Sequence, residues 1–219
     1  MYIFRSDGAI SVPGHGLGRR EKPEIVVGWE NFYRDRGRKV DLSGVAIPRK
    51  PLLRQWRLLI VIKMLNERLY QQCKEEYPCY RGNITDLDRW APHHERTAEA
   101  NPYAIWVLDT PEPHKELTDL SAIELRRQGI PTETLTERML HGLRFYTETE
   151  NHLDKRLMTL CAGSRNHVGL VPMVYHHGGE MCISSTSDHY VEQNNSDDGC
   201  RADPLGWKGD IRRARRVKI

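Results

Sequence analysis

The sequence predicts an α+β fold, in which an antiparallel or mixed sheet packs on two or three helices. Two short apolar runs, "RLLIVIK" and "YAIWVL", have the length and the β-branched or aromatic content of buried strands. A well-marked helix follows them, and three strand-like runs follow that helix in one block. Strands that follow one another, without a helix between each pair, favour α+β over a doubly wound sheet.

Three regions are expected from the composition of the chain. Residues 1–50 are rich in Gly, Arg and Pro and form an irregular N-terminal arm, with "AISV" and "PEIVVGW" as candidate short strands. Residues 51–188 form the α+β core domain, and residues 189–219 form a polar and basic C-terminal tail. With 219 residues, 38% of them hydrophobic, the chain is long enough for one substantial core with extensions.

The first half of the core domain is expected to contain two strands and one helix. Residues 57–63 form a strand, although a long helix from Pro51 stays open because length alone does not decide such a run. The composition turns helical over 66–77, before Pro78. A second strand covers Tyr103–Leu108, and the polar stretch between this helix and this strand is expected to be a surface loop.

Two more helices and three strands are expected in the second half. A short helix begins after Asp119 or Ser121, either of which can cap it. Thr134 and Glu137 form a capping box for the next helix, which carries an apolar stripe of Leu135, Met139, Leu143 and Tyr146. The runs "RLMTLCAG", "LVPMVYH" and "MCISST" then predict three strands, the last two joined by a hairpin at "HHGGE".

Bulk properties limit the class of protein. The net charge of +3 permits phosphate-bearing partners without demanding them. No apolar run approaches the roughly 20 residues that span a bilayer, so we expect no membrane partner and a cytoplasmic location. Five cysteines without CxxC spacing predict neither a disulfide framework nor a zinc ribbon, and no cofactor is expected. The oligomeric state does not follow from the sequence.

From about Arg57 onward the chain resembles a family of uncharacterised proteins predicted from the genomes of uncultivated bacteria. The motifs that carry this resemblance are "YPCYR", "YAIWVLD", "ELTDLSAIELRRQGI", "TLTERMLHGLRFYTETENHLD" and "TLCAGSR…GLVPMVY". The resemblance implies an intact fold and a bacterial origin. It implies no activity and no functional residues.

Metal and nucleophile sites are weakly indicated. Zinc needs about four convergent donors, but only His176 and His177 are adjacent, and neighbours on a strand point to opposite faces, so we expect no metal. Cys161 lies close in sequence to Arg165 and His167, which suits a thiolate, but a buried cysteine is the commoner case. Four carboxylates at strand ends and in loops could bind a metal ion, but no second metal-binding group follows them at a fixed spacing. They are Asp86, Asp88, Asp109 and Glu112.

The corner formed by Gly163, Ser164 and Arg165 is the candidate site for a small anion. Gly163 permits close backbone approach, Ser164 offers a hydroxyl, and Arg165 offers a guanidinium fork for phosphate or carboxylate. The competing interpretation is a tight turn whose arginine pairs with an internal acidic residue.

Basic residues cluster towards both ends of the chain and suggest a function. We expect a non-enzymatic binding protein that contacts a phosphate-bearing partner, nucleic acid first, with Trp29, Tyr33 and Trp207 as exposed aromatics. Two alternatives stay open: a small enzyme acting on an anionic substrate at the Gly163 corner, and a structural or protein-interaction module. The candidate contact residues are Arg34, Arg36, Arg38, Lys39, Arg212, Arg213, Arg215 and Arg216.

Overall fold

The chain divides into two units, one ending at Ser43 and the other beginning at Gly44. A computed structural model describes residues 22–52, 55–113, 117, 120–187, 212–214 and 217–218. The strand expected at "AISV", and the candidate contact residues Trp207, Arg215 and Arg216, lie outside these described residues.

The first unit contains helix α1, Glu24–Asp35, where the sequence suggested a short strand at "PEIVVGW"; that expectation is wrong. The physical reason is the spacing of the buried side chains, which recur every three or four residues and so form one helical face: Val26, Trp29, Phe32 and Tyr33. Lys22 donates to Glu30 at 2.7 Å, and Glu30 accepts from the backbone N–H of Leu42 at 2.8 Å, which holds the following segment along the helix.

The second unit contains a three-stranded sheet in the order β1-β4-β10. Strands β1 (Trp56–Val61) and β4 (Tyr103–Leu108) are antiparallel, and β10 (Val217–Lys218) lies antiparallel on the other edge of β4. The two predicted strands are confirmed, and the alternative of a long helix from Pro51 is wrong. Every residue of β1 except Arg57, and every residue of β4 except Tyr103, is buried, as expected for continuous apolar runs.

A five-stranded mixed sheet has the order β2-β8-β7-β5-β9. Its centre is the predicted meander, in which β5, β7 and β8 are antiparallel in turn. Gly178 and Gly179 turn the hairpin with φ of 59° and 88°, values that glycine adopts without strain. Strand bounds are Cys79–Tyr80 (β2), Met158–Leu160 (β5), Val171–His177 (β7), Glu180–Thr186 (β8) and Arg212–Ala214 (β9).

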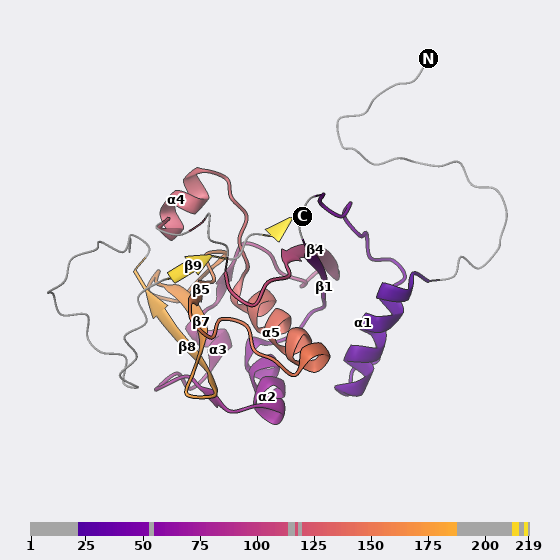
Figure 1. The fold of residues 1–219 in the computed structure, drawn as a ribbon, viewed down its shortest axis with the longest axis horizontal. Helices are drawn as coiled ribbons and strands as arrows, with labels where there is room; N and C mark the ends of the chain where they lie inside the picture. Colours follow the sequence, from indigo (N-terminus) through magenta and orange to yellow (C-terminus); the bar gives the residue numbers. More distant parts are fainter. Residues whose placement is uncertain are drawn as a thin grey trace, which may run out of the picture. The chain divides into compact units, whose positions relative to one another are not determined.

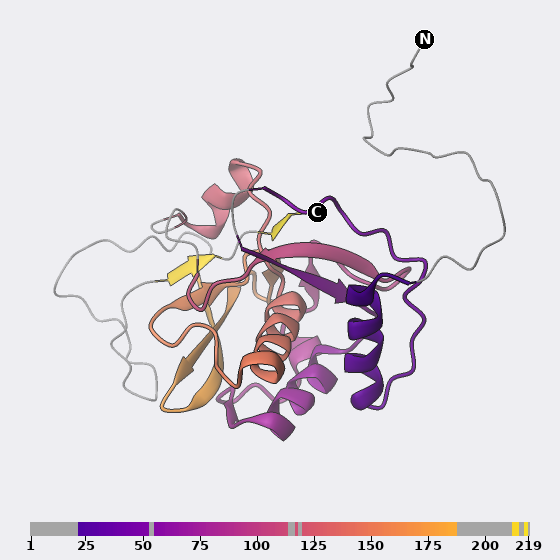
Figure 2. The same ribbon diagram turned by 45° about the vertical axis from the view of Figure 1, so that its right-hand side comes forward.

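Helix α5 (Leu135–Thr149) connects the two sheets, because it contacts β1 of one sheet and β7 of the other. Helix α2 (Asn66–Glu76) packs against α5, and the short helix α4 (Ala122–Arg127) covers β5 and β7. Figure 1 and Figure 2 show α5 at the centre of this unit, with the five-stranded sheet on one side and β1 and β4 on another. The predicted α+β class is confirmed.

Both predicted helix starts are capped by side chains. The Thr134 hydroxyl accepts from Glu137 N–H at 3.2 Å, and the Glu137 carboxylate accepts from Thr134 N–H at 2.7 Å, so the α5 capping box is confirmed. Ser121 and Glu124 form the same box for α4. The other proposed cap, Asp119, lies outside the described residues.

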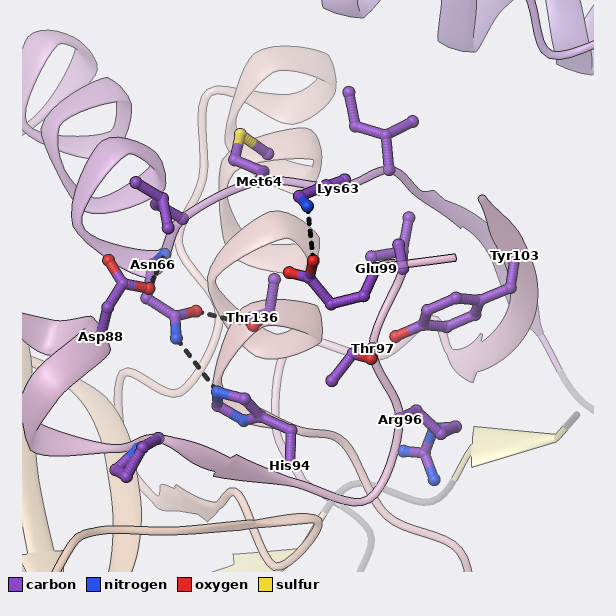
Figure 3. Close-up of a pocket in the computed structure, with 15 residues that line it drawn as sticks. Lys63, Met64, Asn66, Asp88, His94, Arg96, Thr97, Glu99, Tyr103 and Thr136 are labelled. Atoms are coloured by element: carbon purple, nitrogen blue, oxygen red, sulfur yellow. Dashed lines mark hydrogen bonds and ion pairs between the residues drawn. The ribbon is translucent and has the colours of Figure 1, made fainter. Parts of the chain in front are cut away.

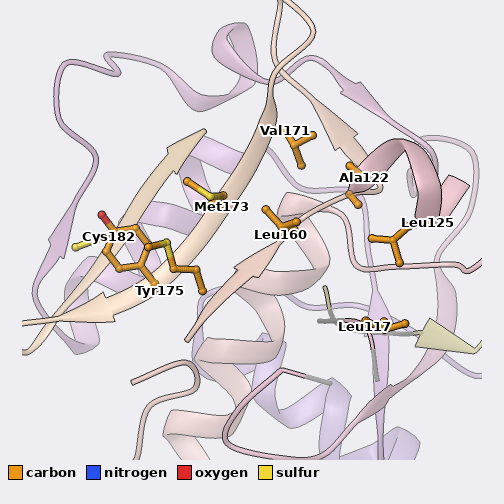
Figure 4. Packing of buried hydrophobic residues seen from close by; sticks show 10 residues of the cluster. Leu117, Ala122, Leu125, Leu160, Val171, Met173, Tyr175 and Cys182 are labelled. Atoms are coloured by element: carbon orange, nitrogen blue, oxygen red, sulfur yellow. The ribbon is translucent and has the colours of Figure 1, made fainter. Parts of the chain in front are cut away.

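An apolar cluster fills the space between α4 and the five-stranded sheet (Figure 4). Leu125 and Val171 are fully buried, and Leu160 and Met173 are nearly so. Removing such side chains from water is the main stabilising contribution to the fold, at about 25 cal/mol per Å² of apolar surface.

The stretch from 85 to 100 corrects the expectation of a surface loop. It contains helix α3 (Leu87–Trp90) and strand β3 (His93–His94), and the Leu87 side chain is fully buried. Strand β3 pairs with β6 (Ser164–Arg165), which brings His94 directly opposite Ser164. Across the described residues, no helix is both long enough and apolar enough to cross a membrane.

Candidate functional site

A pocket of about 250 Å³ lies where the end of β1 meets the start of α2 (Figure 3). Residues 92–99 form another wall, and α5 contributes Thr136. With Asp88 and Tyr103, the pocket gathers side chains from five separate stretches of the second unit. Its polar floor is formed by Asn66, His94 and Thr136.

His94 is held on one side by Ser164. The imidazole Nδ1 lies 2.7 Å from Ser164 Oγ, which also accepts a hydrogen bond from the backbone N–H of Leu135 at 2.9 Å. Leu135 is the first residue of α5 and Ser164 is 1% exposed. The hydroxyl of Ser164 thus joins the start of α5 to the pocket histidine.

On the other side His94 contacts Asn66. The Thr136 hydroxyl donates to Asn66 Oδ1 at 2.6 Å, which leaves the Asn66 amide nitrogen to donate to His94 Nε2 at 3.2 Å. With Nε2 accepting, the imidazole proton lies on Nδ1 and is donated to Ser164 Oγ. The chain of hydrogen bonds fixes both the ring orientation and the tautomer.

Burial lowers the pKa of His94 below its ordinary value of 6.5, against the opposing effect of the Glu137 and Asp88 carboxylates. The imidazole is therefore neutral at neutral pH. His94 offers the pocket a polar ring without a positive charge.

The charged side chains of the pocket are matched by opposite charge or by a helix end. Lys63 Nζ lies 2.6 Å from Glu99 Oε2. Both oxygens of Glu137 accept from the Arg96 guanidinium at 2.8 Å. The Asp88 carboxylate accepts from the first two backbone N–H groups of α2, at 2.8 and 3.1 Å, where the helix dipole favours a negative charge.

Glu137 has a central structural role behind the pocket wall. It is fully buried, closes the α5 capping box, and also accepts from the Tyr103 hydroxyl at 2.8 Å. Arg96 and Tyr103 are thus fixed by one carboxylate. Because that guanidinium is committed to Glu137, it cannot serve as an anion receptor without breaking a buried pair.

The Gly163, Ser164 and Arg165 corner does not line this pocket. A Cβ at Gly163 would lie 3.1 Å from the Thr132 carbonyl oxygen, so the close approach that this glycine permits is to the chain itself. Arg165 Nη1 donates to the carbonyl oxygens of Ala162 and Ser164, at 2.8 and 2.6 Å. An anion site at this corner stays a prediction. Ser164 reaches the pocket only through His94.

Cys161 is fully buried, and burial raises the pKa of its thiol well above the ordinary value. This fits the interpretation as a core residue. His167 is exposed and contacts the carbonyl of Trp90. Within the described ranges, no three His, Cys, Asp or Glu side chains gather as metal ligands.

Each of the loop carboxylates makes its own structural contact within the fold. Asp86 caps α3, and Asp109 accepts from Arg57 at 2.9 Å. Glu112 accepts from the backbone N–H groups of residues 156 and 157. With Asp88 at the start of α2, these carboxylates serve separate structural contacts.

The basic contact candidates of the first unit lie at and after the end of α1. Arg34 and Lys39 are exposed, whereas Arg36 lies 4.0 Å above the Phe32 ring. The expectation of exposed aromatics is wrong for Trp29 and Tyr33, which are 2% and 1% exposed. They lie on the apolar face of the helix. Arg212 and Arg213 belong to β9, whose backbone pairs in parallel with β5.

A second polar group, the buried cluster, lies between α5 and the five-stranded sheet. It comprises Arg138, Asp154, Thr159, His152 and His176. Arg138 and Asp154 are an ion pair with no exposed surface, and the Thr159 hydroxyl donates to Asp154 at 2.7 Å. His176 donates from Nδ1 to the carbonyl of Leu153 at 2.7 Å and stacks on His152 with ring centroids 4.2 Å apart.

The buried cluster is only partly satisfied. Arg138 Nη1 and His176 Nε2 have no hydrogen-bond partner among the described residues. Burial lowers the pKa of His176 to about 3, helped by Arg138 and His152 and opposed by Asp154. Burial also lowers the pKa of His152.

Sequence analysis missed both His94 and Asn66 as pocket residues. Asn66 was placed at the start of a helix without a role, and His94 fell within the supposed loop.

Comparisons with known proteins add no family and no fold relative: no protein-family model, no curated protein and no solved structure matches the chain. The geometry of the pocket is therefore the basis for a proposed function.

Proposed function

We propose that the protein is a binding protein whose pocket accepts a small molecule without surplus charge. The observation that carries this proposal is the balanced pocket. Its four charged side chains are already matched, and its histidine is neutral: Lys63, Asp88, Arg96, Glu99 and His94. A multiply charged phosphate compound would meet as many carboxylates as cations there, so its own charge would stay unbalanced.

The pocket also has an apolar side, which a ligand with an apolar part would cover. The apolar lining residues include Val61, Met64, Leu65, Pro92 and Ala98. Leu65 is 63% exposed, so apolar surface remains in contact with water at the rim. Covering such surface supplies affinity, while fixed polar groups supply specificity.

A ligand screen tests this proposal. The full chain is mixed with amino acids, sugars, carboxylic acids and nucleosides, and backbone amide signals are followed by NMR. Binding in the pocket shifts the signals of residues 61–66 and 92–99. Ligands that shift only other residues, or a screen in which nothing shifts these signals, would overturn the proposal.

A blocking variant sharpens this test. Thr97→Trp places a large ring at the pocket, where Thr97 is exposed, and abolishes the shifts. Thr147→Trp is the matched control, because Thr147 is exposed on α5 about three turns beyond Thr136. Equal loss of binding in both variants would contradict a site in the pocket.

The second candidate function is contact with a phosphate-bearing partner, nucleic acid first. It is supported by the exposed Arg34 and Lys39 near the end of α1, in the first unit. Each phosphate contact contributes to a fall in affinity with rising salt. The buried Trp29 and Tyr33 remove base stacking by these rings from this hypothesis.

Binding of a labelled single strand and a duplex at several salt concentrations tests this candidate. The double variant Arg34→Gln, Lys39→Gln should reduce the slope of log affinity against log salt by about 2. Lys74→Gln, at an exposed position on α2, should leave it unchanged. Binding that is insensitive to salt, or equal slopes in both variants, would contradict it.

A further inference from the structure

The Lys63–Glu99 pair differs from the other charges of the pocket. Its ammonium and carboxylate are 2.6 Å apart, and both side chains are 67% exposed. Figure 3 shows the two side chains pointing toward each other within the pocket, beside the chain of Asn66, Thr136 and His94. This pair is the one place where the pocket presents a positive and a negative group side by side in contact with water.

The pair can open at low cost. An exposed ion pair contributes little to stability, because water solvates the separated charges well. Arg96 and Asp88 are different, since one is held by the buried Glu137 and the other by the start of α2. A charged ligand would therefore engage Lys63 and Glu99 before either of those groups.

The ligand that matches an adjacent cation and anion carries the opposite charges in the same arrangement. An α-amino acid has its ammonium and carboxylate on one carbon atom and no net charge. Such a ligand replaces one ion pair by two, without leaving any charge unmatched. A simple amine or a simple acid would satisfy one partner and leave the other without its counter-charge.

We infer that the pocket binds an α-amino acid with an apolar side chain of moderate size, its carboxylate facing Lys63 and its ammonium facing Glu99. This inference rests on the proposed binding function of the pocket. The side chain contacts the apolar wall of Val61, Met64 and Leu65. The pocket volume of about 250 Å³ suits a molecule of the size of leucine.

Three probes with one side chain test the inference by calorimetry on the full chain. L-leucine carries both charges, 3-methylbutylamine lacks the carboxylate, and 4-methylpentanoate lacks the ammonium. Leucine should bind about three- to fivefold more tightly than either of the others, the difference expected for one exposed ion pair. An amine or an acid that binds as tightly as leucine would overturn the inference.

Two pocket variants assign the contacts. Lys63→Gln should weaken leucine and 4-methylpentanoate about three- to fivefold, whereas 3-methylbutylamine should bind at least as tightly as before, because Glu99 then has no lysine to give up. Glu99→Gln should weaken leucine and the amine to the same extent, and the acid should bind at least as tightly as before. Lys74→Gln and Glu75→Gln, both at exposed positions on α2, should leave all three affinities as they are. Variants that affect the three probes equally would overturn the assignment of the two charges.

The outcomes separate the inference from the proposed function. If leucine does not bind while a sugar or a nucleoside shifts the amide signals of the pocket, the inference is wrong and the pocket still binds a small molecule. If no probe shifts these signals, both are wrong. Saturation with inorganic phosphate, tested in parallel, should not displace leucine, and displacement would contradict the charge balance on which the inference rests.

Discussion

Two histidines of the second unit show how differently a fold can hold a neutral imidazole. His94 borders the pocket, and both of its ring nitrogens have partners in Ser164 and Asn66. His176 belongs to the buried cluster, where one nitrogen donates to a carbonyl and the other has no partner among the described residues. The pocket network is thus fully hydrogen-bonded at its histidine, whereas the buried cluster has polar atoms without a partner among the described residues.

The stability of the fold depends strongly on the polar groups of the buried cluster and only weakly on those of the pocket. The side chains of Arg138 and Asp154 have no exposed surface, so the charge of each is balanced inside the protein and chiefly by the other. Lys63 and Glu99 can separate and be solvated by water at almost no cost in free energy, because both side chains are exposed. Four changes test this contrast.

The largest effect is expected from Arg138→Met. Loss of the guanidinium leaves the Asp154 carboxylate buried without a counter-charge, which costs about 3–5 kcal/mol in the free energy of unfolding. Urea unfolding followed by circular dichroism measures this. Lys63→Gln is the surface comparison and should cost less than about 1 kcal/mol. Similar losses for the two variants would remove the distinction between the regions.

Ser164→Ala is expected to have the next largest effect. It removes the acceptor for two donors, the N–H of Leu135 and Nδ1 of His94, at a cost of about 2–3 kcal/mol. Nitrogen chemical shifts of His94 should show a mixture of tautomers in place of one. Unchanged stability together with a single tautomer would show that Ser164 does not position this ring.

Acid should act mainly through the buried cluster. The pKa of His176 is about 3 in the folded state against an ordinary 6.5, so the unfolded state takes up the proton first. This contribution to stability is complete above pH 6.5 and is lost as the pH falls towards 3, by about 2 kcal/mol between pH 7 and pH 5. His152 acts in the same direction.

His176→Asn is the matched variant for this acid effect. The asparagine amide can keep the donation to the Leu153 carbonyl and does not titrate. Urea unfolding measures the free energy of unfolding at pH 7 and at pH 5. Its decrease between these two pH values should be about 2 kcal/mol smaller in His176→Asn than in the parent chain. A pH dependence equal to that of the parent would mean that other groups carry it.

The smallest effect is expected at the start of α2. Asp88→Ala leaves two backbone N–H groups of α2 without their carboxylate, at a cost of about 1 kcal/mol. Thermal unfolding measures this. Lys74→Ala, at the exposed C-terminal part of the same helix, should be nearly neutral. A larger loss than in Ser164→Ala would show that the carboxylate supports more of the pocket than the helix start.

The fold was largely predictable because its signals are local. Strand residues 57–61, the Thr134–Glu137 capping box and the Gly178–Gly179 hairpin each depend on neighbours within a few positions. The helix at Glu24–Asp35 was missed because Val26 and Val27 favour strands locally, while the buried spacing of Trp29 and Tyr33 shows only over three turns.

The candidate site was predictable only in part. Ser164 was selected from sequence for its hydroxyl, but its contact with His94 joins residues 70 positions apart. Such a contact follows from the pairing of two-residue strands, which have no periodicity to detect. Residues 85–100 have the polar composition of a solvated loop, because only a few of their side chains, such as Leu87, are buried.

The last two strands, β9 and β10, are close in sequence but belong to different sheets. Strand β9 completes the edge of the five-stranded sheet, and β10, beginning three residues after β9 ends, completes the edge of the other. During synthesis, β4 emerges roughly a hundred residues before its neighbour β10, and such distant pairings form slowly. Until residues 212–218 are synthesised, β4 and β5 therefore each lack a neighbour on one side, and in this interval the nascent chain is most exposed to association with other strands.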